Sequence, residues 1–118
     1  VFEIAVHLET DKRTHTVIGT LFSNSDPVIC SIDGMRVDAR PEGNMLLCEN
    51  EDVPMMIGRI ATILGQADIN IANLVLGRDK PGGKALTVFN VDQPVPEETM
   101  RAILETPHVL NAFTLDLS

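Results

Sequence analysis

The chain has 118 residues, 44% of them hydrophobic, which suits one domain or one small domain with an appendage. Its formal net charge of −8 argues against nucleic acid and anionic membrane surfaces as partners, because both attract clustered Lys and Arg. No apolar run approaches the roughly 20 residues that a membrane span requires. Two lone cysteines, Cys30 and Cys48, form no CxxC pattern and favour reduced, buried thiols in a cytoplasmic protein.

The first part of the chain is expected to form strands joined by turns. It begins at Val1, already within a strand-like pattern, so we expect a piece cut from a longer protein. Alternating and β-rich segments predict strands at residues 1–10, 14–22, 28–32 and 35–38. The first two predict an antiparallel hairpin, and Asp33-Gly34 is a strong tight-turn signal between the last two. Arg40-Pro41-Glu42-Gly43 breaks the pattern, so we expect domains at residues 1–43 and 44–118.

The second part alternates strands and helices in the order βαββαβ. Strands are expected at residues 45–48, 69–76, 85–91 and 109–117. Pro54 has the fixed φ favoured where a helix starts, apolar residues follow at helical spacing to residue 67, and Asp68 ends that helix. Pro96 starts a second helix that Pro107 stops. The order predicts a ferredoxin-like α+β fold, an antiparallel four-stranded sheet with two helices on one face.

Polar side chains gather where strands of this unit end or begin. Asn50 and Asp52 close the first strand and Asn70 begins the second, so we expect them to lie close together at one end of the sheet. Asp52 has an ordinary interpretation too, since an acid before a helix complements its dipole. The connection at residues 79–84 is expected to be mobile and to tolerate substitution, because no apolar side chain anchors it. Replacing Gly82 and Gly83 with Ala would cost more if their φ values are positive.

Patterns for catalysis, metal binding and nucleotide binding are missing from the sequence. No GxGxxG or P-loop follows a strand, and His7, His15 and His108 are scattered without ligand spacing. The CxxC of soft-metal carriers and the basic, aromatic strands of RNA-recognition domains, two other users of this fold, are also missing. We therefore expect no catalytic residue, no metal and no cofactor in this part of a protein.

Several stretches carry a family resemblance. Residues 50–54, the Ile-rich helix and residues 68–72 resemble an ACT domain, an amino-acid-sensing regulatory module. Longer stretches resemble the C-terminal part of the long-form D-3-phosphoglycerate dehydrogenase family, at residues 16–22, 32–38, 41–47 and 77–92. The resemblance makes residues 1–43 the C-terminal part of an intervening domain of the allosteric substrate-binding type. It makes residues 44–118 a complete ACT domain.

The resemblance implies L-serine as the effector, bound at an interface between two subunits. Asn50, Asp52 and Asn70 occupy the matching positions. Asp52 and the amide carbonyls would accept hydrogen bonds from the ammonium group, and backbone N–H groups near Met55 and Met56 would suit the carboxylate.

Some positions depart from the family pattern. Met55 stands where the family usually has Gly, so its side chain would crowd the pocket or its backbone would need an angle that Gly accepts easily. Val53 replaces the usual Arg, and both changes keep open a dimerisation-only ACT module that no longer binds ligand. In relatives whose intervening domain binds an anion, a basic cluster does so. Arg40 stands at one such position, whereas Pro27 and Asn90 occupy others.

The resemblance also implies a parent enzyme. It would oxidise 3-phosphoglycerate with NAD at the entry to serine synthesis, while this part would be regulatory, cytoplasmic and homo-oligomeric through its ACT domain. The similar regulatory segment of iron–sulfur L-serine dehydratases is the competing interpretation. Sequence upstream of Val1 separates the two, because a dinucleotide fingerprint indicates the dehydrogenase and cluster-binding cysteines the dehydratase.

Overall fold

The computed structural model describes residues 2–9, 14–21 and 27–117. The chain divides into two compact units, Val1–Pro41 and Glu42–Ser118. The division falls within the Arg40-Pro41-Glu42-Gly43 segment that interrupts the strand pattern. Among the described residues, neither helix has the length and apolar character needed to cross a membrane.

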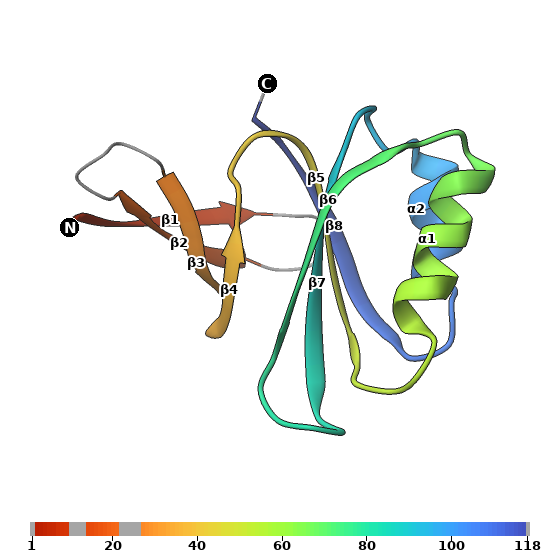
Figure 1. The fold of residues 1–118 in the computed structure, drawn as a ribbon, viewed down its shortest axis with the longest axis horizontal. Helices are drawn as coiled ribbons and strands as arrows, with labels where there is room; N and C mark the ends of the chain where they lie inside the picture. The colour runs from red at the N-terminus through yellow and green to blue at the C-terminus, as the bar shows by residue number, and fades with distance from the viewer. Residues whose placement is uncertain (1, 10–13, 22–26, 118) are drawn as a thin grey trace. The chain divides into compact units, whose positions relative to one another are not determined.

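The first unit is a four-stranded antiparallel sheet in the order β1-β2-β3-β4 (Figure 1). Its strands are β1 (Phe2–Glu9), β2 (Thr14–Leu21), β3 (Pro27–Ile32) and β4 (Met35–Ala39). The predicted hairpin is confirmed, since β1 and β2 pair from Phe2 opposite Leu21 to Glu9 opposite Thr14. Residues 10–13, between the two strands, and the predicted strand ends at Val1, Thr10 and Phe22 lie outside the described residues.

The predicted tight turn between β3 and β4 is confirmed. Asp33 and Gly34 have φ angles of 49° and 84°, as the central residues of a type I′ hairpin turn require. The Asp33 carboxylate accepts the Thr16 backbone N–H at 2.8 Å and lies 2.7 Å from Nδ1 of the buried His15. These bonds connect the turn to β2, so His15 serves the packing of this sheet.

The second unit has the predicted βαββαβ order. Its elements are β5 (Gly43–Glu51), α1 (Met56–Gln66), β6 (Ile71–Arg78), β7 (Lys84–Val91), α2 (Glu97–Leu104) and β8 (Val109–Leu117). The sheet order is β6-β7-β5-β8 with every neighbouring pair antiparallel, and both helices cover the same face (Figure 1). The expectation of a ferredoxin-like α+β fold is confirmed.

Both ends of α1 are set by residues with left-handed backbone angles. Met55 has φ 74°, which a continuing helix cannot include, so α1 begins at Met56 rather than at Pro54 as predicted. Asp68, with φ 59°, ends the helix as expected. The backbone N–H of Ile69 still donates to the Leu64 carbonyl at 3.0 Å, so β6 begins at Ile71, two residues after the predicted start.

The core of this unit lies between the sheet and its two helices. α1 contributes Ile60 and Leu64, one helical turn apart, and α2 contributes Ile103. The sheet contributes inward-facing residues that include Leu46, Cys48 and Phe89. Burying each large apolar side chain contributes roughly 1.5–3 kcal/mol of stability.

The two cysteines are free thiols in different surroundings. Cys48 is buried in this core and Cys30 is partly buried in the other unit, where its thiol lies near the Thr20 hydroxyl. Burial raises the pKa of Cys48 from 9.0 to about 12, because the thiolate is poorly solvated there. Cys48 is therefore an inert member of the core at neutral pH.

Candidate functional site

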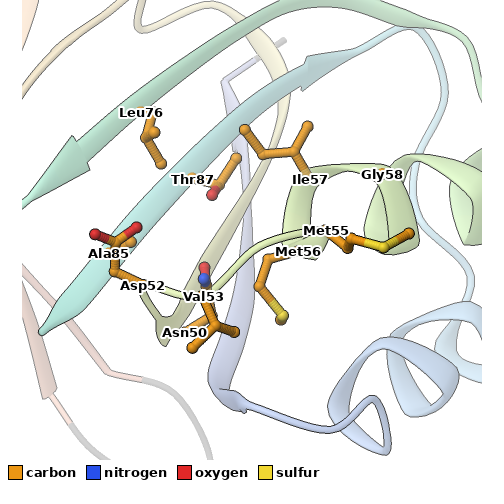
Figure 2. A pocket seen from close by; sticks show the side chains of 10 residues that line it. All are labelled: Asn50, Asp52, Val53, Met55, Met56, Ile57, Gly58, Leu76, Ala85 and Thr87. Carbon is orange, nitrogen blue, oxygen red and sulfur yellow. The ribbon is translucent and has the colours of Figure 1, made fainter. Parts of the chain in front are cut away.

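A pocket of about 270 Å³ opens where β5 meets the start of α1 (Figure 2). Asn50 and Asp52 line it from the end of β5, residues 56–58 from the first turn of α1, and Leu76 and Thr87 from β6 and β7. Strand pairing explains this grouping, since Thr87 lies opposite both Cys48 and Leu76. Cys48 belongs to the helix-covered core, so the side chains of this set share that face of the sheet.

Two buried polar atoms in this pocket have no hydrogen-bond partner among the described residues. They are Oδ1 of Asn50 and Oγ1 of Thr87, on side chains that are 2% and 1% exposed. The Asn50 amide Nδ2 is satisfied, because it donates to the Glu51 carbonyl at 2.8 Å. A buried polar group without a partner costs about 1–3 kcal/mol, so the pocket offers two places where a ligand atom would stabilise the protein.

The N-terminus of α1 supplies the positive side of the pocket. No side chain caps this helix, and the Met55 carbonyl first receives a bond from Arg59, at 3.0 Å. The backbone N–H groups of residues 56–58 are therefore the first-turn donors that a helix leaves without intrahelical acceptors. Together with the helix dipole they favour a negatively charged group, such as a carboxylate, at this end.

Asp52 supplies the negative side and also holds a neighbouring loop. Its Oδ2 accepts the Gly82 backbone N–H at 3.1 Å and lies 3.2 Å from Nη1 of Arg78. Its own N–H donates to the Gly83 carbonyl at 2.8 Å. Asp52 thus joins the end of β5 to the connection between β6 and β7. This role goes beyond the ordinary one of an acid that complements a helix dipole.

The connection at residues 79–84 is held by hydrogen bonds to its own backbone. Oδ1 of Asp79 accepts the backbone N–H groups of Lys80 at 2.7 Å and Lys84 at 2.9 Å. Gly82 has φ 75°, and a Cβ on Gly83 would lie 2.5 Å from Oδ1 of Asp79. Polar backbone bonds thus hold this connection in place of an apolar contact. The positive φ of Gly82 is the case in which a substitution was expected to cost more, and the mobility of the connection stays a prediction.

Asn70 lies at the other end of the sheet from Asn50 and Asp52. Asn50 pairs with Ala85, which pairs with Arg78, whereas Ile71 pairs with Val91. Both β5 and β6 run antiparallel to β7, so they are parallel to each other and the start of one lies beside the start of the other. The expectation that these residues lie together within one chain is therefore wrong. Asn70 instead donates from Nδ2 to the Asp92 carboxylate at 2.8 Å.

Met55 shows one of the two consequences expected for a side chain at its position. Its backbone has the left-handed angle, at φ 74°, and its side chain is 70% exposed. Figure 2 shows that side chain directed away from Asp52 and Thr87. Met55 lies at the rim of the pocket, where its side chain strains the backbone rather than filling the space beside Asp52 and Thr87.

The remaining polar candidates lie outside the pocket. Arg40 is exposed just after β4, in the first unit. His108 lies beside the end of β5, where its Nδ1 is 2.8 Å from Oε2 of Glu51. In the part of the chain that the structure describes, no three His, Cys, Asp or Glu side chains cluster as metal ligands would.

Two residues of the site were missed by the sequence interpretation, Arg78 and Thr87. Thr87 left one signal, since it is a polar residue at an inward-facing position within the apolar run of β7. No sequence pattern indicated Arg78, because its contact with Asp52 joins residues far apart in the sequence.

Comparison with known proteins identifies the class. Residues 44–108 match the ACT domain family, and the chain belongs to that family. Three D-3-phosphoglycerate dehydrogenases illustrate the wider similarity, each over 97% of this chain and 22% of the relative. The identities are 36% with the protein of Methanocaldococcus jannaschii, 32% with that of Archaeoglobus fulgidus and 30% with that of Bacillus subtilis. The resemblance predicted from the sequence is thereby confirmed: the chain matches the C-terminal region of that enzyme and spans about a fifth of its length.

Proposed function

We propose that the chain is the regulatory region of an NAD-dependent D-3-phosphoglycerate dehydrogenase of serine biosynthesis. In this proposal residues 44–118 bind L-serine and join subunits, and residues 1–43 end an intervening domain in which Arg40 contacts an anion. NAD and the catalytic residues belong to the rest of the enzyme. The names of the relatives favour this parent over an iron–sulfur L-serine dehydratase.

The pocket beside α1 is the observation that carries the proposal. It combines the carboxylate of Asp52, the open N-terminus of α1 and the unpaired Asn50 oxygen around a volume of about 270 Å³. A free amino acid is the small molecule with complementary chemistry, because its ammonium group suits Asp52 and Asn50 while its carboxylate suits the N–H groups near Met55 and Met56.

The edge of the sheet supports a site shared between two copies. β6 is an edge strand, and its Leu74 and Leu76 side chains are exposed. If two β6 strands pair antiparallel about a two-fold axis, the start of one lies beside the end of the other. Asn70 of a second copy would then approach Arg78, and through it Asp52. The position of Asn70 at the far end of its own sheet is what such a shared site requires.

Calorimetric titration with L-serine tests the proposal on the unmodified chain and on Asp52→Asn. The variant keeps an oxygen acceptor for the Gly82 N–H but loses the charge that attracts the ammonium group. Losing a charge-assisted hydrogen bond costs roughly 1.5–3 kcal/mol, so the Kd should rise about 10- to 150-fold. The matched control is Asp68→Asn, an exposed charge at the other end of α1, which should leave the Kd unchanged.

A dimerisation-only ACT module is the second candidate, and it is favoured by Val53, which lines the pocket at a position where the family pattern has Arg. If this candidate is correct, the unmodified chain self-associates but shows no heat of binding when it is titrated with L-serine. That result would overturn the effector proposal.

A further inference from the structure

We propose that Thr87 makes the pocket selective for an amino acid whose side chain ends in a hydroxyl group. The inference rests on the proposed function of the pocket and adds a specificity-determining residue to it. The comparison that matters is between L-serine and L-alanine, which differ only by that hydroxyl.

The position of Thr87 makes its hydroxyl unusual. Thr87 lies inside β7, between β5 and β6, on the face that α1 and α2 cover. Its side chain is 1% exposed, and its Oγ1 has no hydrogen-bond partner in the described part of the chain. Valine has the same shape and has no hydroxyl group to bury without a partner, so packing alone gives no reason for a hydroxyl here.

Asn50 supplies a second atom in the same situation. Asn50 lies opposite Ala85 on the neighbouring strand, so it is the diagonal neighbour of Thr87 on one face of the sheet. Figure 2 shows the Thr87 hydroxyl and the amide end of Asn50 directed toward one another across the pocket. Oδ1 of Asn50 is buried and lacks a partner among the described residues, as Oγ1 of Thr87 does.

A single chemical group of the ligand can form hydrogen bonds with both atoms at once. It must accept a hydrogen bond from the Thr87 hydroxyl and donate one to the Asn50 oxygen. A hydroxyl has both capacities, whereas an ammonium group only donates and a carboxylate only accepts. The methyl group of L-alanine leaves the Thr87 hydroxyl without a partner, and it removes one of the two donors that the Asn50 oxygen could accept from L-serine. Selectivity is strong when buried polar groups of a site would otherwise stay unpaired.

The test is calorimetric titration of L-serine and L-alanine into the unmodified chain, Thr87→Val and Thr87→Ser, each checked for folding by circular dichroism. The unmodified chain should bind L-serine about tenfold more tightly than L-alanine. Thr87→Val should reduce this preference below about threefold and leave the Kd for L-alanine within about threefold. Thr87→Ser keeps the hydroxyl and should keep the preference. The matched control is Thr114→Val, an exposed position on β8 outside this pocket, which should also keep it.

The outcomes separate this inference from the proposed function. An undiminished L-serine preference in Thr87→Val, its loss in Thr87→Ser, or equal binding of both amino acids to the unmodified chain would overturn the role of Thr87 alone. If neither amino acid binds to the unmodified chain, the proposed function fails and this inference with it.

Discussion

Met55 combines a left-handed backbone angle with a place at the rim of the proposed effector pocket. An L-residue with a left-handed backbone angle is destabilised by about 1–2 kcal/mol, and Gly avoids most of that strain. We predict that Met55→Gly raises the free energy of unfolding by roughly 1 kcal/mol, measured by urea denaturation. The Kd for L-serine should change less than about threefold, because the Met55 side chain is exposed and directed away from the pocket.

A helical position provides the control for Met55→Gly. Gln66, the last residue of α1, is exposed and has no positive φ, so Gln66→Gly should lower stability by up to about 1 kcal/mol. A tenfold gain in L-serine affinity in Met55→Gly would show that the side chain obstructs the ligand after all. That result would contradict the geometry described above.

At the scale of elements, the connection between β6 and β7 is a turn held in place by the carboxylate of Asp79. A Cβ on Gly83 would meet Oδ1 of Asp79 at 2.5 Å and Cγ of Lys80 at 2.9 Å. We predict that Gly83→Ala lowers the free energy of unfolding by about 1 kcal/mol or more, because Asp79 must move from the two backbone N–H groups it accepts. Chemical denaturation measures this change.

Gly65 in α1 is the matched control for that substitution. A Cβ at Gly65 meets nothing within 4 Å, and Ala is the better helix former, so Gly65→Ala should raise stability by up to about 1 kcal/mol. If both substitutions stabilise the chain, the polar anchoring of the turn contributes nothing measurable.

Local sequence patterns were sufficient for the order of the elements. Helical spacing from Met56 onward and the β-rich runs on either side predicted the βαββαβ order, since each signal lies within the element it defines. The start of α1 was missed because a positive φ at Met55 depends on the turn that precedes the helix. Asp33-Gly34 was predicted correctly because the turn type is determined by those two residues themselves.

The candidate site was harder to predict, because its geometry depends on contacts between distant residues. Asn50 and Asp52 were identified from their place at a strand end. Their relation to Asn70 depends on how β5, β7 and β6 pair, and Asn70 turned out to lie at the opposite end of the sheet. The bond from Gly82 to Asp52 spans 30 residues of sequence, so no local pattern could reveal it.

At the scale of the whole molecule, the second sheet has two edge strands, β6 and β8, through which copies could pair in the proposed dimer. Pairing through β6 would create two equivalent pockets, each using Asn50 and Asp52 of one copy and Asn70 of the other. Pairing through β8 would leave Asn70 far from both pockets, because β8 is the opposite edge of the sheet. In the proposed dimer, the choice of edge would therefore decide whether the effector site is shared between copies.

A lysine in each edge strand distinguishes the two arrangements. Leu74 is exposed in the middle of β6, and a charge buried in a strand pairing there would be left without a partner. We predict that Leu74→Lys weakens self-association more than tenfold by light scattering, and that L-serine binding weakens with it because Asn70 of the second copy is lost. Leu110→Lys, on the exposed surface of β8, should leave both unchanged. If Leu110→Lys dissociates the chains and Leu74→Lys does not, association runs through β8 and each pocket must bind its ligand without Asn70.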